Sequence, residues 1–275
     1  MTQEISFDNG AAYERYMGVW SQLAGEQFLD WLHPADGLRW LDVGCGNGAF
    51  TEMIVERCAP SAVHGVDPSD AQIGFAQERP TTHMAEFKVG DAMALPFADD
   101  TFDAAVMPLV IFFVPEPARG VAEMARVVAP GGIVSAYGWD LLGGGFPYTT
   151  LWDEMRALEL HVPMPPSPDA ARIETLRQLW TEAGMASVET REIIAERTFA
   201  NFDEYWATIL MGPSVAPSLA ALDADGMTRL MDRMRARLTA DAGERLTCTA
   251  RANAITGRVP PTRGKTEREI AVAQK

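Results

Sequence analysis

"LDVGCGNGAF", residues 41–50, runs an apolar strand into a turn with three glycines in five positions, Gly44, Gly46 and Gly48. Asp42 stands just before the turn. Glycine has no Cβ, so its backbone can adopt positive φ and approach a ligand closely. A tight turn alone does not need so many glycines, so this stretch predicts a ligand site beyond the end of a buried strand.

Strands and helices alternate around this turn. Residues 9–32 have the apolar spacing of a helix, and Ser69 and Gln72 have the spacing of a capping box. The pattern predicts strands at 38–43, 61–67, 84–90, 101–110 and 131–139, and further helices at 49–58, 69–79 and 115–132. Strands joined through helices pair in parallel by right-handed crossovers. Residues 34–139 are therefore expected to form the core of a Rossmann-like, doubly wound α/β sheet.

The second half of the chain has a different pattern. Residues 140–168 are rich in glycine and proline around a helical piece at 151–160, and a helix is expected to start at Ser167 and Pro168 and to end at Gly184. Two long strands are expected at 187–199 and 245–259, with helices at 202–211 and 227–238 between them. We expect one domain over 1–259, with helical lid insertions at about 140–168 and 201–240, and a flexible tail at 260–275.

The composition limits the partners. A net charge of −15 over 275 residues argues against a protein that grips nucleic-acid phosphates or an anionic membrane surface. The first residues, MTQEISFDNG, lack the pattern of a secretory signal, and no apolar stretch approaches the length of a membrane span. Cys45, Cys58 and Cys248 are scattered and match no zinc site, so we expect a metal-free cytoplasmic protein, monomer or homodimer.

Acidic residues follow the next two strands. Asp67 ends the second strand, where an acid can accept both hydroxyls of a ribose, and Asp91 ends the third, where it can meet the edge of a base. The turn also loosely satisfies the dinucleotide fingerprint G-x-G-x-x-A. However, Asp42 would repel a pyrophosphate and suits an ammonium or sulfonium, and no Tyr-x-x-x-Lys follows the fourth strand. The acids therefore favour a cationic adenosine-like cofactor.

Four ordered motifs cover residues 38–137: "LDVGCGNG", "VHGVDPS", "VGDAMALPFADDTFDAAVM" and "EMARVVAPGGIV". In combination they resemble the class I S-adenosylmethionine-dependent methyltransferase family, in the branch of small-molecule enzymes related to those acting on quinones and sterols. The resemblance implies a seven-stranded sheet with a reversed final β-hairpin. It also implies S-adenosyl-L-methionine as the cofactor and S-adenosyl-L-homocysteine as the product.

The resemblance further implies a set of cofactor-binding residues. Those at the first three strand ends are Asp42, Gly44, Gly46 and Gly48 around the methionine part, Asp67 and Pro68 at the ribose and adenine, and Asp91 and Ala92 at the adenine edge. Met107, Pro108 and Leu109 match the segment that lines the methionine moiety and the methyl group. "YERYMGVW" resembles an N-terminal helix that closes over the cofactor, with Tyr13, Tyr16, Met17 or Trp20 facing it.

The acceptor side is less defined. The fourth strand continues as "MPLVIFFV", without the polar motif of relatives that methylate DNA or glutamine. This run either forms the wall of a site for a small, partly apolar molecule or packs the following helix. No catalytic base is assigned; the candidates are His161, Tyr137 and Asp140. Two other functions remain open: a sensor or partner subunit that binds S-adenosylmethionine without methylating, and an NAD-dependent oxidoreductase.

Overall fold

The described residues of the computed structural model, 14–212, 215–239 and 245–261, include one seven-stranded sheet. Its order is β3-β2-β1-β4-β5-β7-β6. The strands are β1 (Arg39–Val43), β2 (Ala62–Asp67), β3 (Ala85–Val89), β4 (Phe102–Pro108), β5 (Val128–Trp139), β6 (Ala186–Phe199) and β7 (Leu246–Arg258). Strands β1 to β5 pair in parallel, and β7 runs antiparallel to both β5 and β6. The predicted doubly wound sheet with a reversed final hairpin is confirmed.

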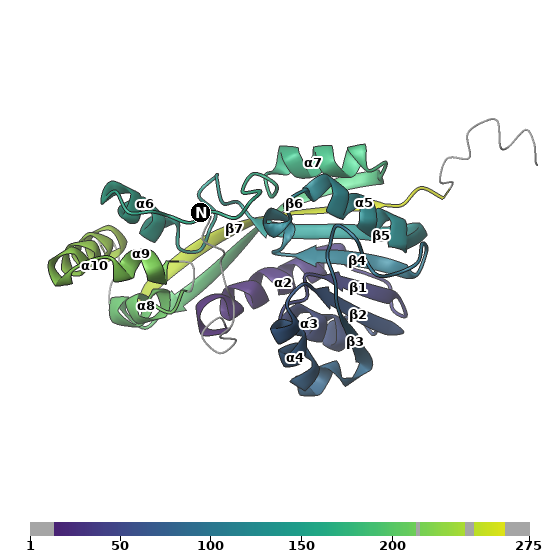
Figure 1. Cartoon of the computed structure of the whole chain (residues 1–275), viewed down its shortest axis with the longest axis horizontal. Coiled ribbons are helices and arrows are strands. Elements are labelled where there is room, and N and C mark those ends of the chain that lie inside the picture. The colour runs from purple at the N-terminus through teal and green to yellow at the C-terminus, as the bar shows by residue number, and fades with distance from the viewer. Residues whose placement is uncertain (1–13, 213–214, 240–244, 262–275) are drawn as a thin grey trace, which may run out of the picture.

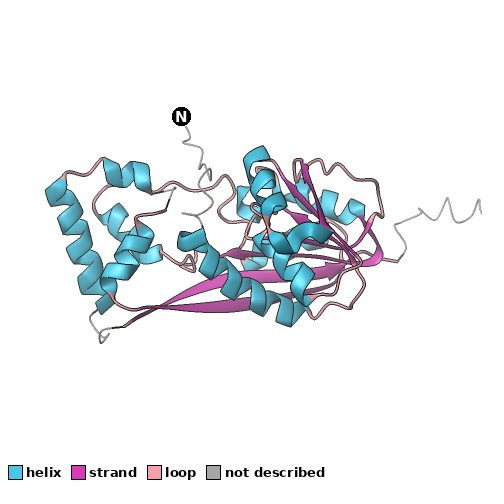
Figure 2. Cartoon of the chain, turned by 90° about the horizontal axis from the view of Figure 1, so that it is seen from below, coloured by secondary structure: helices cyan, strands magenta, loops and turns pink. Residues whose placement is uncertain are grey.

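Helices cover both faces of this sheet (Figure 2). Those beside the sheet are α2 (Val19–Leu32), α3 (Ala49–Arg57), α4 (Asp70–Glu78), α5 (Pro117–Val127) and α7 (Ile173–Glu182). The ring of Tyr137 in β5 packs against Phe28 of α2 and Phe50 of α3. Met107 in β4 pairs with the residue before Tyr137 and reaches Gly120 of α5. Because successive strand residues face opposite sides, α2 and α3 lie on one face and α5 on the other.

The last two strands are longer than the sheet beside them. β6 and β7 stay paired from Ala186–Arg258 to Phe199–Leu246, whereas β5 pairs only with residues 252–258 of β7. The excess forms a two-stranded ribbon, and Figure 1 shows further helices gathered near its far end. These helices are α6 (Thr149–Ala157), α8 (Phe202–Ile209), α9 (Ala216–Ala220) and α10 (Ala224–Thr239). Short helices η1 (Glu14–Gly18), η2 (Pro80–Met84) and η3 (Ile111–Phe113) complete the described elements.

Several predicted boundaries are wrong, and tertiary contacts explain those at the fifth strand and at α7. The fifth strand begins at Val128, ahead of the glycines, because Gly131 and Gly132 exchange backbone hydrogen bonds with Val259. The helix expected at 115–132 therefore ends earlier, at Val127. Helix α7 begins at Ile173, after the expected Ser167. The Ser167 hydroxyl donates to the Val114 carbonyl at 2.8 Å, so it ties down a loop where a helix cap was expected. The predicted tail lies, from residue 262 on, outside the described residues.

Candidate functional site

The glycine turn lies at the carboxyl edge of the sheet, between β1 and α3 (Figure 1). The amides of Gly44 and Cys45 both donate to the Val66 carbonyl, at 2.7 and 3.0 Å, and so tie the turn to β2. β1 has β2 on one side and β4 on the other, all parallel. Asp67 at the end of β2 and Pro108 at the end of β4 therefore lie at the same edge as the turn.

The three glycines of the turn differ in what surrounds them. A Cβ on Gly44, which has φ +74°, would lie 2.5 Å from the Val110 side chain. A Cβ on Gly48 would lie 3.0 Å from that of Ala76, so Gly48 lets α3 and α4 approach each other. Gly46 has φ +52°, and beyond its two neighbours in the chain no described atom comes within 4 Å of its Cβ position. Gly46 is thus the glycine that leaves space for a ligand against the backbone.

Asp42 is a buried acid with one unused oxygen. Its side chain is 0% exposed, and its Oδ2 accepts a hydrogen bond from the Thr51 hydroxyl at 2.7 Å. Its Oδ1 is buried and has no hydrogen-bond partner among the described residues. Burial raises the pKa of Asp42 to about 7; the Thr51 hydrogen bond lowers it and the nearby Asp67 raises it. An uncompensated buried carboxylate is costly, so this site favours a cationic ligand group.

Asp67 connects the turn to the second strand. Its Oδ2 accepts from the amide of Gly46 at 3.0 Å, and its Oδ1 accepts from the amide of Ser69 at 2.9 Å. Burial raises the pKa of Asp67, although these two backbone hydrogen bonds lower it. Each carboxylate oxygen can accept more than one hydrogen bond, so acceptor capacity remains for ligand hydroxyls. Pro68, the next residue, is exposed.

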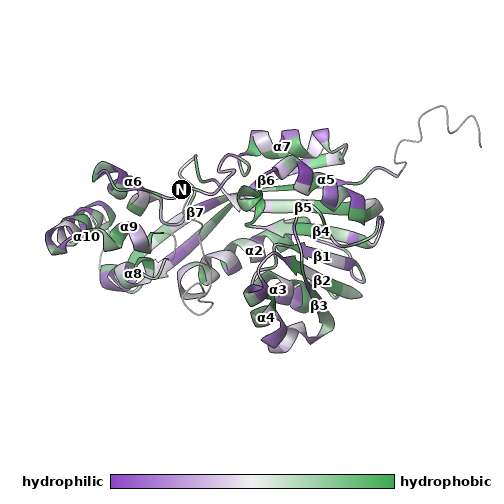
Figure 3. Ribbon diagram, in the orientation of Figure 1, coloured by the Kyte–Doolittle hydropathy of each residue, from purple (hydrophilic) through white to green (hydrophobic). Residues whose placement is uncertain are grey.

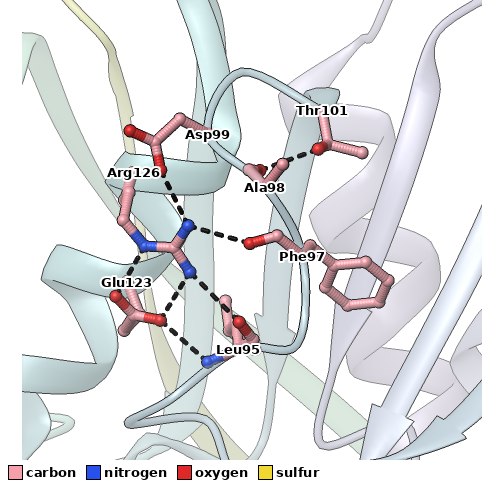
Figure 4. Close-up of polar contacts among 7 residues, drawn as sticks. All are labelled: Leu95, Phe97, Ala98, Asp99, Thr101, Glu123 and Arg126. Carbon is pink, nitrogen blue, oxygen red and sulfur yellow. Dashed lines mark hydrogen bonds and ion pairs between the residues drawn. The ribbon is translucent and has the colours of Figure 1, made fainter.

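The third strand end is exposed, but its loop is anchored. Asp91 is exposed and accepts from the amide of Met93 at 2.8 Å, and Ala92 beside it is half-buried. Farther along the loop, Arg126 of α5 donates to the carbonyls of Leu95 and Phe97 (Figure 4). Glu123 of α5, Asp99 and Arg126 also form ion pairs in this anchor. The anchor was not predicted from the sequence, although the i,i+3 spacing of Glu123 and Arg126 was an available signal.

Met107 and Leu109, both predicted to line the cofactor site at the end of the fourth strand, differ in their surroundings. Met107 is buried and its side chain lies against Gly120 of α5, away from the α3 face. Leu109 is half-buried with φ +59°, and its amide donates to the Tyr137 carbonyl at 2.7 Å. A leucine with positive φ is strained, and such residues concentrate at functional sites. The turn at Leu109 brings Val110 onto Gly44, so Leu109 is the better placed of the two for a ligand at the glycine turn.

The N-terminal helix packs against segments from the second half of the chain. The ring of Tyr16, in the π-helix η1, stacks on Tyr148 with centroids 4.6 Å apart. The Tyr148 hydroxyl donates to the Tyr16 carbonyl at 2.6 Å and accepts from the Trp20 indole at 3.1 Å. A Cβ on Gly212 would lie 2.7 Å from the Tyr16 ring. Tyr148 was not predicted, and Tyr13 lies outside the described residues.

The three base candidates differ in their surroundings. Tyr137 is 1% exposed, with its ring centroid 4.7 Å from that of Phe28. Asp140 forms an ion pair with Arg251 at 2.6 Å and accepts from the amide of Gly143. His161 is exposed. Structural contacts thus engage Tyr137 and Asp140, and these surroundings single out none of the three as a base.

The two predicted lid insertions meet through α6 and α10. Glu154 of α6 is buried and pairs with Arg233 at 2.5 Å and Arg237 at 3.2 Å of α10. Burial raises the pKa of Glu154, but the two arginines bring it below its usual value. Leu230 and Met234 of α10 are fully buried. Residues 140–168 and 201–240 therefore share a packed contact.

No helix in the described part of the chain combines the length and apolar character needed to cross a membrane. In residues 14–212, 215–239 and 245–261, no group of three or more His, Cys, Asp and Glu side chains is arranged to hold a metal ion.

Part of the chain is similar to known methyltransferases. A family model described as a methyltransferase domain matches residues 41–136. The chloroplastic 2-methyl-6-phytyl-1,4-hydroquinone methyltransferase 2 of Oryza sativa is 40% identical over 113 residues, which are 40% of this chain and 32% of the rice protein. The demethylmenaquinone methyltransferase of Desulfitobacterium hafniense is 36% identical over 103 residues, 36% of this chain and 41% of that protein. The chain thus spans less than half the length of these two relatives.

The fold is found over most of the chain in solved structures. The phosphoethanolamine N-methyltransferase 2 of Haemonchus contortus, in complex with S-adenosyl-L-methionine, superposes with a TM-score of 0.56 at 19% identity. The match covers 92% of this chain and 57% of that one.

Proposed function

Because residues 41–136 match the methyltransferase domain family, we propose that this chain binds S-adenosylmethionine at the carboxyl edge of its sheet and transfers the methyl group to a small molecule. The observation that carries the proposal is the buried Oδ1 of Asp42, without a partner in the described chain, just before a turn in which the Cβ position of Gly46 is open. The cationic methionine end of the cofactor would compensate the charge of Asp42, and it could lie against the backbone at Gly46.

Different residues of the chain would bind different parts of such a cofactor. Asp42 compensates the cationic methionine end, and Gly46 lets that end lie against the backbone. Asp67 has spare acceptor capacity for the ribose hydroxyls, and Asp91 with Ala92 stands at the next strand end for the adenine. The anchor from α5 fixes the loop that follows Asp91 (Figure 4). The carboxyl ends of β1, β2 and β3 together fit one extended nucleoside.

Methyl transfer demands positioning more than acid–base chemistry from the protein. Bound S-adenosylmethionine supplies a sulfonium whose methyl carbon is open to in-line attack. Val110, which follows the end of β4, lies against Gly44 of the turn and excludes water from that side. A base is needed only for an acceptor that must lose a proton.

We propose a partly apolar acceptor and assign its recognition to the lid segments 140–168 and 201–240. Ile111 and Phe112 are buried, and Phe112 lies against the backbone of β5, which favours packing over a site wall for both. The aromatic cluster of Tyr16, Tyr148 and Phe146 instead joins the N-terminal helix to the first lid segment. The rice relative is named for an acceptor with a phytyl chain, which supports an apolar acceptor here. Exchanging both segments for those of a relative should change acceptor preference; an unchanged preference would refute this assignment.

Calorimetry separates the cofactor classes. The full chain should bind S-adenosylmethionine and S-adenosylhomocysteine and should not bind NAD; tight NAD binding without adenosylhomocysteine binding would overturn the proposal. Asp67→Ala should weaken cofactor binding by about 1–3 kcal/mol, because it removes hydrogen bonds from a charged group. Asp70→Ala, a neighbouring exposed acid in the first turn of α4, is the matched control and should leave the affinity unchanged.

A cofactor-binding sensor without transferase activity is the second candidate. The engagement of Asp140 by Arg251 and the burial of Tyr137 favour it, since both remove possible bases. Incubating the chain with a methyl-labelled cofactor and a compound extract, followed by mass spectrometry, decides between the two. A labelled product supports the transferase; binding without any labelled product supports the sensor.

A further inference from the structure

Thr51 is the residue of α3 whose side chain holds the buried acid of the site. It follows the glycine turn by three residues, as the third residue of α3, and its side chain is 0% exposed. Its hydroxyl donates to Oδ2 of Asp42 at 2.7 Å. A threonine in a helix has few χ1 rotamers, so this hydroxyl is a stiff donor. The carboxylate of Asp42 is therefore held at one oxygen, while Oδ1 has no hydrogen-bond partner within the described chain.

The groups around Asp42 offer no positive charge in the described part of the chain. Its register partners on the two neighbouring strands are Gly65 of β2 and Val106 of β4, neither of which titrates. Asp67 is the nearby acid, and its charge raises the pKa of Asp42. Burial and these two acids raise the pKa of the Cys45 thiol, so Cys45 stays neutral. Thr51 is thus the side chain that stabilises the ionised form of Asp42.

We propose that Thr51 is a positioning residue: it fixes one oxygen of Asp42 in its ionised form so that the other is presented to the cationic methionine end of the cofactor. This inference rests on the proposed function. It also predicts a coupling between cofactor and proton. In the free protein Asp42 binds a proton more readily than an exposed acid does, and an arriving cation expels that proton to the solvent.

The coupling is measurable without turnover. Titrating the full chain with S-adenosylhomocysteine at pH 7, in two buffers of different ionisation enthalpy, gives the number of protons released. The ligand keeps the ammonium of the methionine end and is chemically stable. Wild type should release a fraction of a proton per ligand bound, because burial raises the pKa of Asp42 to about 7 and the free protein is then partly protonated there.

Thr51→Val removes the hydroxyl and keeps the shape. It should bind S-adenosylhomocysteine about 10-fold more weakly at pH 7 and release close to one proton, because Asp42 then ionises less readily. At pH 9 the difference from wild type should shrink to about 2-fold, since Asp42 is ionised in both. Thr51→Ser should restore the wild-type affinity and proton count.

The matched control is Thr82→Val, which removes another buried hydroxyl, hydrogen-bonded to the Ala76 carbonyl. It should leave proton release unchanged. If wild type binds S-adenosylhomocysteine with no proton release and no pH dependence between 6 and 9, the positioning role is wrong while the proposed function stands. If Thr51→Val weakens binding equally at every pH, Thr51 has only a structural role. Failure of wild type to bind the ligand at any pH overturns both proposals.

Discussion

The inner parallel strand β1 and the antiparallel edge strand β6 bury their residues in different ways, and this difference decides what the sequence reveals. Trp40, Leu41, Asp42 and Val43 of β1 are all buried, whereas β6 alternates buried and exposed residues through its second half. Figure 3 shows largely hydrophobic colouring on the central strands and mixed colouring on α10, which lies away from them in this view. An acid in a wholly buried strand is expensive and therefore informative. Polar residues at the exposed positions of a strand with one buried face are common, so those of β6 do not indicate which acceptor the protein binds.

The largest effect expected among the parallel strands comes from Gly44→Ala, in the turn that follows β1. The new Cβ would lie 2.5 Å from Val110 at φ +74°, so clash and backbone strain together should cost about 3 kcal/mol or more in free energy of unfolding. Gly37→Ala is the matched control, because Gly37 has φ +79° with no described atom within 4 Å of its Cβ position. Strain alone should cost it about 1 kcal/mol in urea unfolding. Equal losses in the two variants would show that Val110 yields and that the turn is not tightly covered.

The sequence predicts features that depend on local sequence or on sheet geometry, and it misses features that depend on contacts between residues far apart in the chain. The parallel strands, the cap at Ser69 and the acids at strand ends depend on neighbours in sequence or on sheet geometry, and the structure has them where expected. The predicted start of α7 was wrong because the Ser167 hydroxyl donates a hydrogen bond to the carbonyl of Val114, 53 residues away. The Tyr148–Tyr16 contact spans 132 residues and leaves no local pattern. Strand alternation could have indicated that Met107 faces α5, but only with the register known.

Asp42→Asn should separate stability from binding in β1. The raised pKa of Asp42, about 7 when folded, means that wild-type stability falls as pH rises from about 4 to about 7, where the unfolded chain has already lost its proton. At pH 8 the neutral asparagine should therefore raise the free energy of unfolding by about 1–3 kcal/mol. This gain is smaller than the full shift in the pKa of Asp42 implies, because the folded chain relaxes around a buried charge. S-adenosylmethionine binding should weaken by about 10-fold or more. A variant that is less stable at pH 8 and binds equally well would mean that Asp42 is structural.

Glu154→Gln tests the contact between the two lid segments. It leaves Arg233 and Arg237 facing a neutral amide, so about 1–2 kcal/mol should be lost from the contact between α6 and α10. Hydrogen exchange in those two helices should speed up, while affinity for S-adenosylhomocysteine stays within about 2-fold. Asp153→Asn is the milder control, because its pairs with Arg156 and Arg237 lie at the surface. A large loss of cofactor affinity in Glu154→Gln would show that the lid and the cofactor edge are coupled.

The smallest effect is expected at the amino edge of the sheet, where Arg39 begins β1 and Asp103 lies near the start of β4. The Arg39 side chain donates two hydrogen bonds to the Asp103 carboxylate and its backbone amide donates a third, and together they hold the pKa of Asp103 below the usual value. This contribution is present above the unfolded pKa and is lost as pH falls through the lower folded pKa. Both side chains are substantially exposed, so Asp103→Asn should cost only about 0.5 kcal/mol at pH 7, and its unfolding should match wild type near pH 2. Ligands of parallel sheets bind at the carboxyl ends of the strands, so S-adenosylhomocysteine affinity should not change. A changed affinity would mean that strain at the amino edge reaches the glycine turn through β1, and the two edges could no longer be treated as separate.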